Sequence, residues 1–429
     1  MNQPDASAIP GSTGDSLSAD LLVVGGGIAG MTAALEAAEA GKTVILVERE
    51  ASLGGRVVSS NQYFPKLCPP TCGLEINLKR IKANPRVSVF TLAEIEGISG
   101  EAGNWSVTIK QKPRYVNMRC TACGECEPAC EIEVDDPANF GLSKRKAIHL
   151  PHLVAYPFRY VVDPEHASDP RMKACVDACP YDAIELDMQP TTVSATVTGI
   201  VWATGWRPYD ATKLTNLAFG QAPNVITNVM MERLASRTGP TEGKIQRPSD
   251  QKAIAKIGFV QCAGSRDENH LPYCSAICCL ASMKQATYVR EQYPDAEIHL
   301  FYIDVRSPGR MEDFYEKVKA DEKIHFHRGK VGKITEGSNG NVILHAENTV
   351  TGEMKETEVD MAVLATGMVP NTDIDPPPVE TPRDDYGFLA PNGSGIIGAG
   401  TVMRPYDVAS SVQDATGAAL RALNAAGGR

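Results

Sequence analysis

The sequence predicts an α/β protein in which a Rossmann-like nucleotide-binding domain is interrupted by a cysteine-rich insert and then by a second α/β domain. Residues 21–47 read as a strand, a glycine-rich turn, a helix and a second strand, which together make one βαβ unit. The alternation stops at about residue 113, where cysteines and prolines cluster up to about residue 190, and it returns at Val197–Val201. A further strand–helix–strand pattern covers residues 254–303.

Composition narrows the class of protein. The chain has 429 residues, enough for two or three domains at roughly 150 residues each. Its net charge is −10 and it has no basic stretch, so we expect no nucleic-acid partner. No uncharged apolar run reaches the ~18 residues of a membrane span, and the polar N-terminus does not resemble a signal peptide, which predicts a cytoplasmic protein. Twelve cysteines in that compartment favour metal or redox roles over structural disulfides.

A glycine fingerprint marks the dinucleotide site. Gly25, Gly27 and Gly30 form G-x-G-x-x-G between the first strand and the helix. This spacing allows a tight turn, the approach of a pyrophosphate to the helix N-terminus, and close packing of helix on strand. Glu48 ends the second strand, where its carboxylate can accept hydrogen bonds from ribose hydroxyls. A glycine-rich packing turn without ligand is the alternative.

The insert carries a ferredoxin-like motif. Its first half reads C-x2-C-x2-C-x3-C, a spacing typical of a [4Fe–4S] cluster, at Cys120, Cys123, Cys126 and Cys130. A second half is degenerate, because it keeps only the final C-x3-C-P of Cys175, Cys179 and Pro180.

In two-cluster ferredoxins the last cysteine of each half ligates the cluster of the other half. That rule predicts one complete site from Cys120, Cys123, Cys126 and Cys179. A local site closed by Cys130 is the alternative for the fourth ligand, and a zinc knuckle is the alternative for the metal.

Two further cysteine groups follow different patterns. Four cysteines within 18 residues read C-x11-C-x3-C-C, and they are Cys262, Cys274, Cys278 and Cys279. We expect the last three at the start of a helix, and the spacing leaves iron–sulfur, zinc and buried thiols open. Cys68 and Cys72 flank two prolines and a threonine, and they are either a candidate redox pair or part of a structural loop.

Several motifs resemble those of flavoproteins with two dinucleotide-binding domains. The resemblance implies FAD. The motifs on which it rests are Gly54-Gly55-Arg56, Ala203-Thr204-Gly205, Ala365-Thr366-Gly367 and Gly398-Ala399-Gly400. The second α/β segment departs from that pattern, because its first strand leads to Cys262 rather than to a glycine triplet. We therefore expect no NAD(P)H site, with a degenerate fingerprint that still binds the nucleotide as the alternative.

Together these motifs define six stretches of chain. The expected order is a disordered arm (1–18), a FAD-binding domain in three parts (19–112, 191–250 and 361–429), a ferredoxin-like insert (113–190) and a second Rossmann-like domain with the later cysteines (251–360).

The combination resembles the A subunit of heterodisulfide reductases and its relatives. In the longer members a C-x12-C-x3-C-C run binds a [4Fe–4S] cluster, which implies a second cluster on Cys262, Cys274, Cys278 and Cys279, although the spacing here is one residue shorter. The shorter chain and its run from Lys66 to Cys72 most resemble the A subunits of quinone-interacting membrane-bound oxidoreductase complexes of sulfate reducers.

The resemblance implies a cytoplasmic electron-transfer subunit held at the membrane by its partners. Those partners are a membrane haem and iron–sulfur protein, a second subunit with flavin and iron–sulfur groups, and adenylylsulfate reductase, so that electrons pass between the quinone pool and that reductase. A free-standing NAD(P)H-dependent disulfide reductase that uses Cys68 and Cys72 is the alternative enzyme. A flavoprotein scaffold with zinc in the cysteine sites is the alternative without catalysis.

Overall fold

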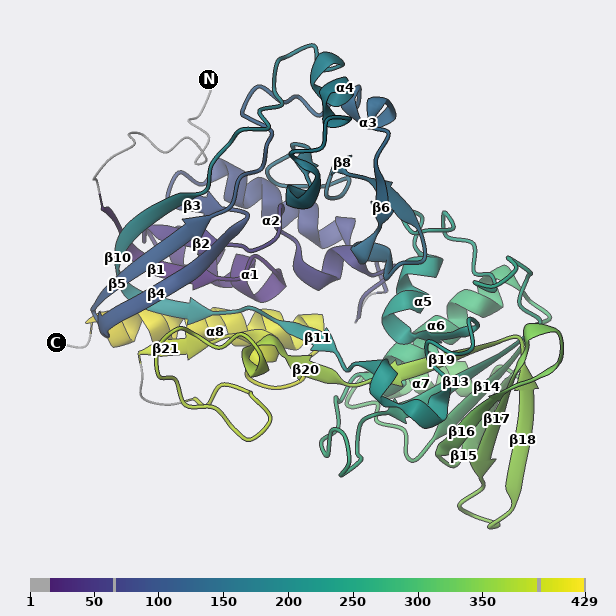
Figure 1. Cartoon of the computed structure of the whole chain (residues 1–429). Coiled ribbons are helices and arrows are strands. Elements are labelled where there is room, and N and C mark those ends of the chain that lie inside the picture. The colour runs from purple at the N-terminus through teal and green to yellow at the C-terminus, as the bar shows by residue number, and fades with distance from the viewer. Residues whose placement is uncertain (1–15, 65–66, 392–394, 428–429) are drawn as a thin grey trace.

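The computed structural model describes residues 16–64, 67–391 and 395–427. Two large sheets organise the molecule, and each collects strands from distant parts of the chain (Figure 1). Within the described residues no helix is long and apolar enough to cross a membrane.

The first sheet has seven strands and contains the predicted βαβ unit. Its order is β3-β2-β1-β10-β5-β4, with β21 also paired to β10. The strands are β1 (Leu17–Val24), β2 (Val44–Val47), β3 (Val87–Phe90), β4 (Ala93–Glu101), β5 (Asn104–Gln111), β10 (Thr191–Trp202) and β21 (Ile396–Gly398). The three helices of one apolar layer pack on this sheet; they are α1 (Ile28–Glu39), α2 (Thr71–Ala83) and α8 (Val408–Gly427). The predicted arm is too long, because Leu17 already pairs with Ala195 in the sheet, and residues 1–15 lie outside the described residues.

The second sheet has five parallel strands in the order β12-β19-β13-β14-β15. They are β12 (Val225–Thr227), β19 (Met361–Thr366), β13 (Lys256–Ala263), β14 (Glu297–Tyr302) and β15 (Ile324–Arg328). One face carries α5 (Asn228–Ala235), α6 (Cys278–Gln292) and α7 (Met311–Lys319). The other face carries an antiparallel sheet of β16 (Val331–Glu336), β17 (Val342–Glu347) and β18 (Met354–Val359).

This topology moves two of the boundaries that the sequence suggested. The second domain was expected over 251–360, but β12 and β19 lie outside that range and still belong to its sheet. The difference arises because β19 pairs between β12 and β13, a long-range arrangement that local patterns do not reveal. A short ribbon of β11 (Trp206–Pro208) and β20 (Met368–Pro370) then joins the two sheets.

The predicted ferredoxin-like insert lies between β5 and β10, beside the first sheet (Figure 1). It has little regular structure and a small core of its own, to which several of its cysteines belong. Its elements are α3 (Cys126–Ala129), α4 (Met172–Asp177) and two small ribbons, β6 (Glu133–Asp135) with β7 (Lys144–Lys146) and β8 (Ile148–His149) with β9 (Val161–Val162).

The loop after the first glycine motifs contacts a buried ion pair of the second domain. Lys284 on α6 lies 3.0 Å from Glu232 on α5, and both side chains are buried. Glu232 also accepts a hydrogen bond from the backbone N–H of Asn61 at 3.0 Å. Phe64, a few residues on, packs in the apolar core of the second domain. A segment of the first domain is therefore anchored inside the second.

Candidate functional site

The glycine loop closes around its own backbone in the manner that the fingerprint predicts. Gly25 has φ +105°, and a Cβ there would lie 2.4 Å from the carbonyl oxygen of Ala203. A Cβ on Gly30 would lie 1.7 Å from the carbonyl oxygen of Gly25, so only glycine lets α1 approach the loop. Gly27 differs, because a Cβ there would meet nothing nearer than 3.8 Å. The space beside Gly27, at the N-terminus of α1, suits a pyrophosphate.

Gly54 and Gly55 lie directly against this loop. The N–H of Gly54 donates to the carbonyl of Gly26 at 2.9 Å. Gly55 has φ +57°, and a Cβ on it would lie 2.7 Å from the Cα of Gly27. Two glycine motifs that are separated in sequence thus form one surface without side chains.

Glu48 is buried and holds the glycine loop as well as facing the nucleotide side. Its Oε2 accepts from the N–H of Gly26 at 2.5 Å, and its Oε1 accepts from the N–H of Glu50 at 2.8 Å. Burial raises the pKa of Glu48, while these two backbone hydrogen bonds act in the opposite direction. The sequence predicted only a ribose contact for Glu48 and not its hydrogen bond to the glycine loop. Each carboxylate oxygen retains a further lone pair that can accept a hydrogen bond from a ribose hydroxyl.

Arg56 links the first glycine pair to the Ala203-Thr204-Gly205 turn. Its Nε donates to the carbonyl of Trp206 at 2.6 Å, and its guanidinium lies 4.8 Å from the centre of the Trp206 ring. Burial lowers the pKa of Arg56 to about 10. The Thr204 hydroxyl is buried and has no partner among the described residues, so it is available to a ligand in this turn. Asn371 fixes the turn by donating to the Thr204 carbonyl at 2.7 Å.

The C-terminal glycine loop reaches the same place from the other end of the chain. Gly400 has φ +70°, and a Cβ on it would lie 2.8 Å from the Cβ of Ala29 in the first turn of α1. Its N–H donates to Asp414 of α8 at 2.7 Å. Asp407 accepts from the N–H of Ser410 at 2.7 Å at the start of that helix. The N-terminal ends of α1 and α8 therefore adjoin, and their partial positive charges favour an anionic ligand there.

Thr366 and Gly367 lie elsewhere, although the sequence grouped them with the flavin motifs. Thr366 ends β19 in the second sheet, and its carbonyl accepts from the Cys278 thiol at 3.6 Å. Its hydroxyl donates to Asn228 at 3.1 Å. These two residues consequently adjoin the later cysteines, because β19 pairs with β13 rather than with the first sheet.

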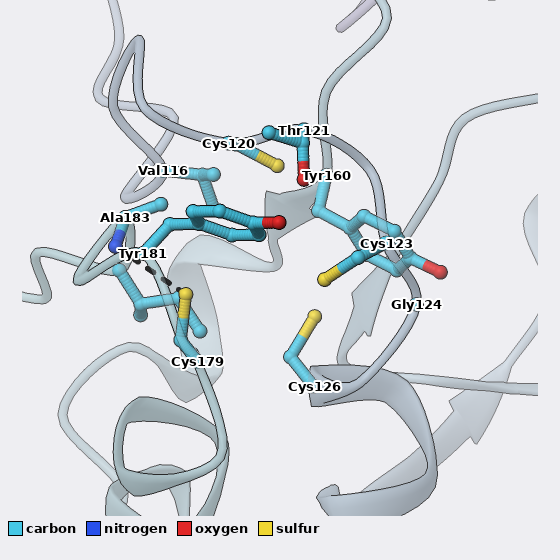
Figure 2. A pocket seen from close by; sticks show the side chains of 11 residues that line it. Val116, Cys120, Thr121, Cys123, Gly124, Cys126, Tyr160, Cys179, Tyr181 and Ala183 are labelled. Carbon is cyan, nitrogen blue, oxygen red and sulfur yellow. Dashed lines mark hydrogen bonds between the residues drawn. The ribbon is translucent and has the colours of Figure 1, made fainter.

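Four cysteines of the insert surround one pocket. Figure 2 shows their side chains directed into it from two segments far apart in sequence. The lining includes Cys120, Cys123, Cys126 and Cys179 together with Val116, Thr121, Gly124, Tyr160, Tyr181, Ala183 and Ile184. These are the four ligands that the ferredoxin rule selects. The pocket also uses Tyr160 and Tyr181, which sequence reasoning missed because no spacing rule connects them to the cysteines.

Backbone N–H groups are directed at the sulfurs of this pocket. Ala122, at φ +54°, donates to Cys120 Sγ at 3.4 Å. Ala183 donates to Cys179 Sγ at 3.3 Å (Figure 2). Hydrogen bonds of this kind stabilise anionic sulfur and tune cluster potentials. In the metal-free chain, burial raises the pKa of Cys126 to about 12, with Cys120 adding to the effect. Removal of that proton is therefore part of metal binding.

Cys130 and Cys175 do not line the pocket. Both are buried in the core of the insert, and the Cys130 thiol donates to the carbonyl of Ile132 at 3.6 Å. Burial raises the pKa of Cys175 to about 12, and the neighbouring Cys130 adds to this. The half-site that lacks two cysteines thus holds a packed pair of thiols.

The later cysteines gather at the end of β13 and the start of α6. Cys262 has φ +56° at the strand end, and Cys278 and Cys279 begin the helix. Cys274 lies in the preceding loop, so the expectation that it lies at the start of this helix with Cys278 and Cys279 is wrong. The helix cannot begin earlier because Ala276 has φ +60°.

The later cysteines influence one another's pKa values. Burial raises the pKa of Cys262 to about 11, with a further contribution from Cys279, while Arg266 lowers it. Burial raises the pKa of Cys278 well above its usual range, and Cys262, Cys279 and Cys274 all add to it. The N–H of Ala276 donates to Cys274 Sγ at 3.3 Å, which repeats the Cys-x-Ala turn of the first cysteine site.

Cys68 and Cys72 lie close to Tyr63. Cys68 pairs with Tyr63 in a short antiparallel bridge, and Cys72 is exposed in the first turn of α2. Burial raises the pKa of Tyr63, and the two cysteines add to this rise. Lys66, part of the motif that guided the narrower family resemblance, lies outside the described residues.

The fold and the first site define an α/β FAD-dependent oxidoreductase. A family model described as FAD dependent oxidoreductase matches residues 20–74, which hold the glycine loop, Glu48 and the glycine pair. The thioredoxin reductase of T. acidophilum superposes with a TM-score of 0.51 at 14% identity, over 95% of this chain and 98% of that one. This likeness confirms the fold with two Rossmann-like domains.

Sequence comparison then identifies the family. The chain is 39% identical over 420 residues to an iron–sulfur A subunit of the CoB–CoM heterodisulfide reductase of Methanopyrus kandleri, which covers 94% of this chain and 64% of the relative. It is 36% identical over 417 residues to the corresponding A subunit of Methanocaldococcus jannaschii, at 93% and 63% coverage. The chain belongs to the family of heterodisulfide reductase A subunits and their relatives. It spans less than two thirds of the length of these two proteins.

Proposed function

We propose that this chain is a FAD and iron–sulfur electron-transfer subunit of an oxidoreductase complex. The observation that carries the proposal is the convergence of Cys120, Cys123, Cys126 and Cys179 on one pocket, in an insert that docks on the flavin motif. The docking contact is made by Leu53, whose N–H donates to the carbonyl of Tyr156 at 3.0 Å.

The C-x2-C-x2-C-x3-C sequence spacing of the insert, with Cys179-Pro180 farther along the chain, supports a cluster rather than zinc. Among the residues that the structure describes, no three His, Cys, Asp or Glu side chains converge enough to hold a single metal ion. Zinc requires its ligands within about 2.0–2.3 Å of one point. In a [4Fe–4S] cluster each thiolate binds a different iron, so the sulfurs stand farther apart.

The proposed division of labour follows from the chemistry of the two cofactor types. A flavin exchanges two electrons and a cluster exchanges one, so the pair converts between two-electron and one-electron transfers. The residues of this chain bind the groups, fix their separation and exclude water. We assign Cys262, Cys274, Cys278 and Cys279 to a second cluster, supported by the Cys-x-Ala turn at Cys274 that matches the one at Cys120.

Iron analysis tests this assignment. Anaerobically prepared protein is expected to contain about eight irons and one FAD per chain. Cys123→Ala and Cys278→Ala are each expected to remove about four irons, from different sites, and to leave the flavin. Stoichiometric zinc in place of iron would support the scaffold alternative.

For the physiological role we propose electron transfer between the quinone pool and adenylylsulfate reductase. The proposed partners are a membrane haem and iron–sulfur protein and a second subunit with flavin and iron–sulfur groups, which would hold this chain at the cytoplasmic face of the membrane. The support is the resemblance of the Cys68–Cys72 motif to that group. Membranes from a strain that lacks this chain should lose quinol-dependent reduction of adenylylsulfate and regain it on complementation. Retention of the full rate would exclude this role.

A further inference from the structure

Ser265 presents a buried hydroxyl that the protein itself does not satisfy. The residue is 2% exposed, and its Oγ has no hydrogen-bond partner among the described residues. Burial of a hydroxyl without a partner costs free energy, so a ligand, an ion or a water is expected beside such an atom. Its position is fixed by the backbone, since its N–H donates to the carbonyl of Cys262 at 3.2 Å and it forms a β-bridge with Leu271.

The hydroxyl lies where three cysteine-bearing segments meet. A Cβ on Gly367 would lie 2.3 Å from Ser265 Oγ and 3.1 Å from Ser275 Oγ. Gly367 follows Thr366, whose carbonyl contacts the Cys278 thiol. Ser275 follows Cys274 directly, and Ser265 lies three residues after Cys262. Ser265 therefore adjoins the loops that supply three of the four later cysteines.

The neighbouring serine has a different explanation. Ser275 Oγ accepts a hydrogen bond from the N–H of Met368 at 2.8 Å, so it fixes the ribbon that leads out of the site. Ser265 has no comparable structural task, which leaves its proton available to an acceptor inside the site.

We propose that the Ser265 hydroxyl donates a hydrogen bond to a sulfur atom of the cluster bound by Cys262, Cys274, Cys278 and Cys279, and thereby raises its reduction potential. The inference rests on the proposed second cluster. A reduced cluster carries more negative charge than an oxidised one, so a donor directed at its sulfur stabilises the reduced state more. Ser265 is a positioning and tuning residue here, because the thiolates alone hold the metal.

Ser265→Ala tests the inference in the complete protein. The variant is expected to keep wild-type iron and flavin contents, while an EPR-monitored titration shows a lower potential for the second cluster and an unchanged potential for the first. Spectra of the reduced second cluster in H2O and D2O should also lose one exchangeable proton coupling. Ser236→Ala removes another buried serine hydroxyl, one bonded to Thr238, and should change none of these signals.

The outcomes separate this inference from the proposed function. Only about four irons in the wild-type protein would contradict the proposed second cluster itself. Full iron in Ser265→Ala with unchanged potential and couplings would overturn the inference alone. Loss of the second cluster in Ser265→Ala would also overturn it, because the residue would then hold the ligand loop rather than donate to sulfur.

Discussion

Gly55 lies directly on Gly27, so that a Cβ on Gly55 would come within 2.7 Å of the Gly27 Cα. The two motifs that the sequence suggests for flavin binding therefore meet as backbone against backbone. Gly27 itself has an ordinary φ of −75°, and its missing side chain faces space. The protein itself requires glycine at position 55, whereas at position 27 we propose that the ligand requires it, so an experiment can separate the two positions.

Gly27→Val should release FAD without unfolding the protein. The backbone accommodates valine, and the nearest atom to a Cβ is 3.8 Å away, but the added methyl groups would occupy the place of the pyrophosphate. The measurement is flavin content after desalting, together with thermal unfolding of the flavin-free protein. Gly332→Val, where a Cβ would meet nothing within 4 Å, is the matched control. Full flavin occupancy in Gly27→Val would show that the ligand binds elsewhere.

Cys179→Ala should remove one cluster, whereas Cys130→Ala should not. Cys179 lines the pocket of the insert, while Cys130 is buried outside it and bonds to Ile132. We expect a loss of about four irons in the first variant and none in the second. Iron and acid-labile sulfide are measured in anaerobic preparations. The reverse result would make Cys130 the fourth ligand.

NADH and NADPH should fail to reduce the flavin rapidly. At the end of β13 the chain turns at Cys262. Gly264 then lies against the ring of Tyr209, because a Cβ on Gly264 would come within 2.7 Å of a ring carbon. The helix α6 begins only at Cys278, so no helix N-terminus follows the strand directly to hold a pyrophosphate. Rapid mixing followed by flavin absorbance is the test, with dithionite as the positive control. Stoichiometric bleaching by either nicotinamide would support the disulfide reductase alternative.

A pair of histidines should make the second domain sensitive to acid. His299 Nδ1 and His327 Nε2 are 2.9 Å apart on β14 and β15. Burial, and then the neighbouring imidazole of His327, lower the pKa of His299 to about 4. Burial, and then the charge of Lys355, lower the pKa of His327 to about 4. The unfolded chain binds these protons near pH 6.5, so stability is complete above that pH and falls as the pH decreases towards 4.

His299→Gln should flatten this dependence. Between pH 7 and pH 5 the free energy of unfolding should fall by about 1–2 kcal/mol less in His299→Gln than in the wild type. Thermal unfolding at the two pH values measures it, and His166→Gln in the insert serves as a control. Equal slopes for His299→Gln and the wild type would show that this pair does not govern acid stability.

Local patterns predicted the βαβ unit, because the fingerprint of Gly25, Gly27, Gly30 and Glu48 lies within one short stretch of sequence. The glycine and cysteine motifs together also predicted the family. They did not predict that β19 inserts beside β13, since strand pairing across about 100 residues leaves no periodic signal. The helix does not begin at Cys274 as expected, because Ala276 has a left-handed backbone conformation. Ser265 could not be recognised at all, because a lone serine acquires significance only from the burial of its hydroxyl.

The contact of Asn61 with the buried pair of Glu232 and Lys284 restricts how the two halves of the molecule can move. Any change in the angle between them would have to withdraw Asn61 from Glu232 and Phe64 from an apolar core. For the proposed electron transfer between the flavin and the second cluster, this anchor would hold the distance between the two halves nearly constant.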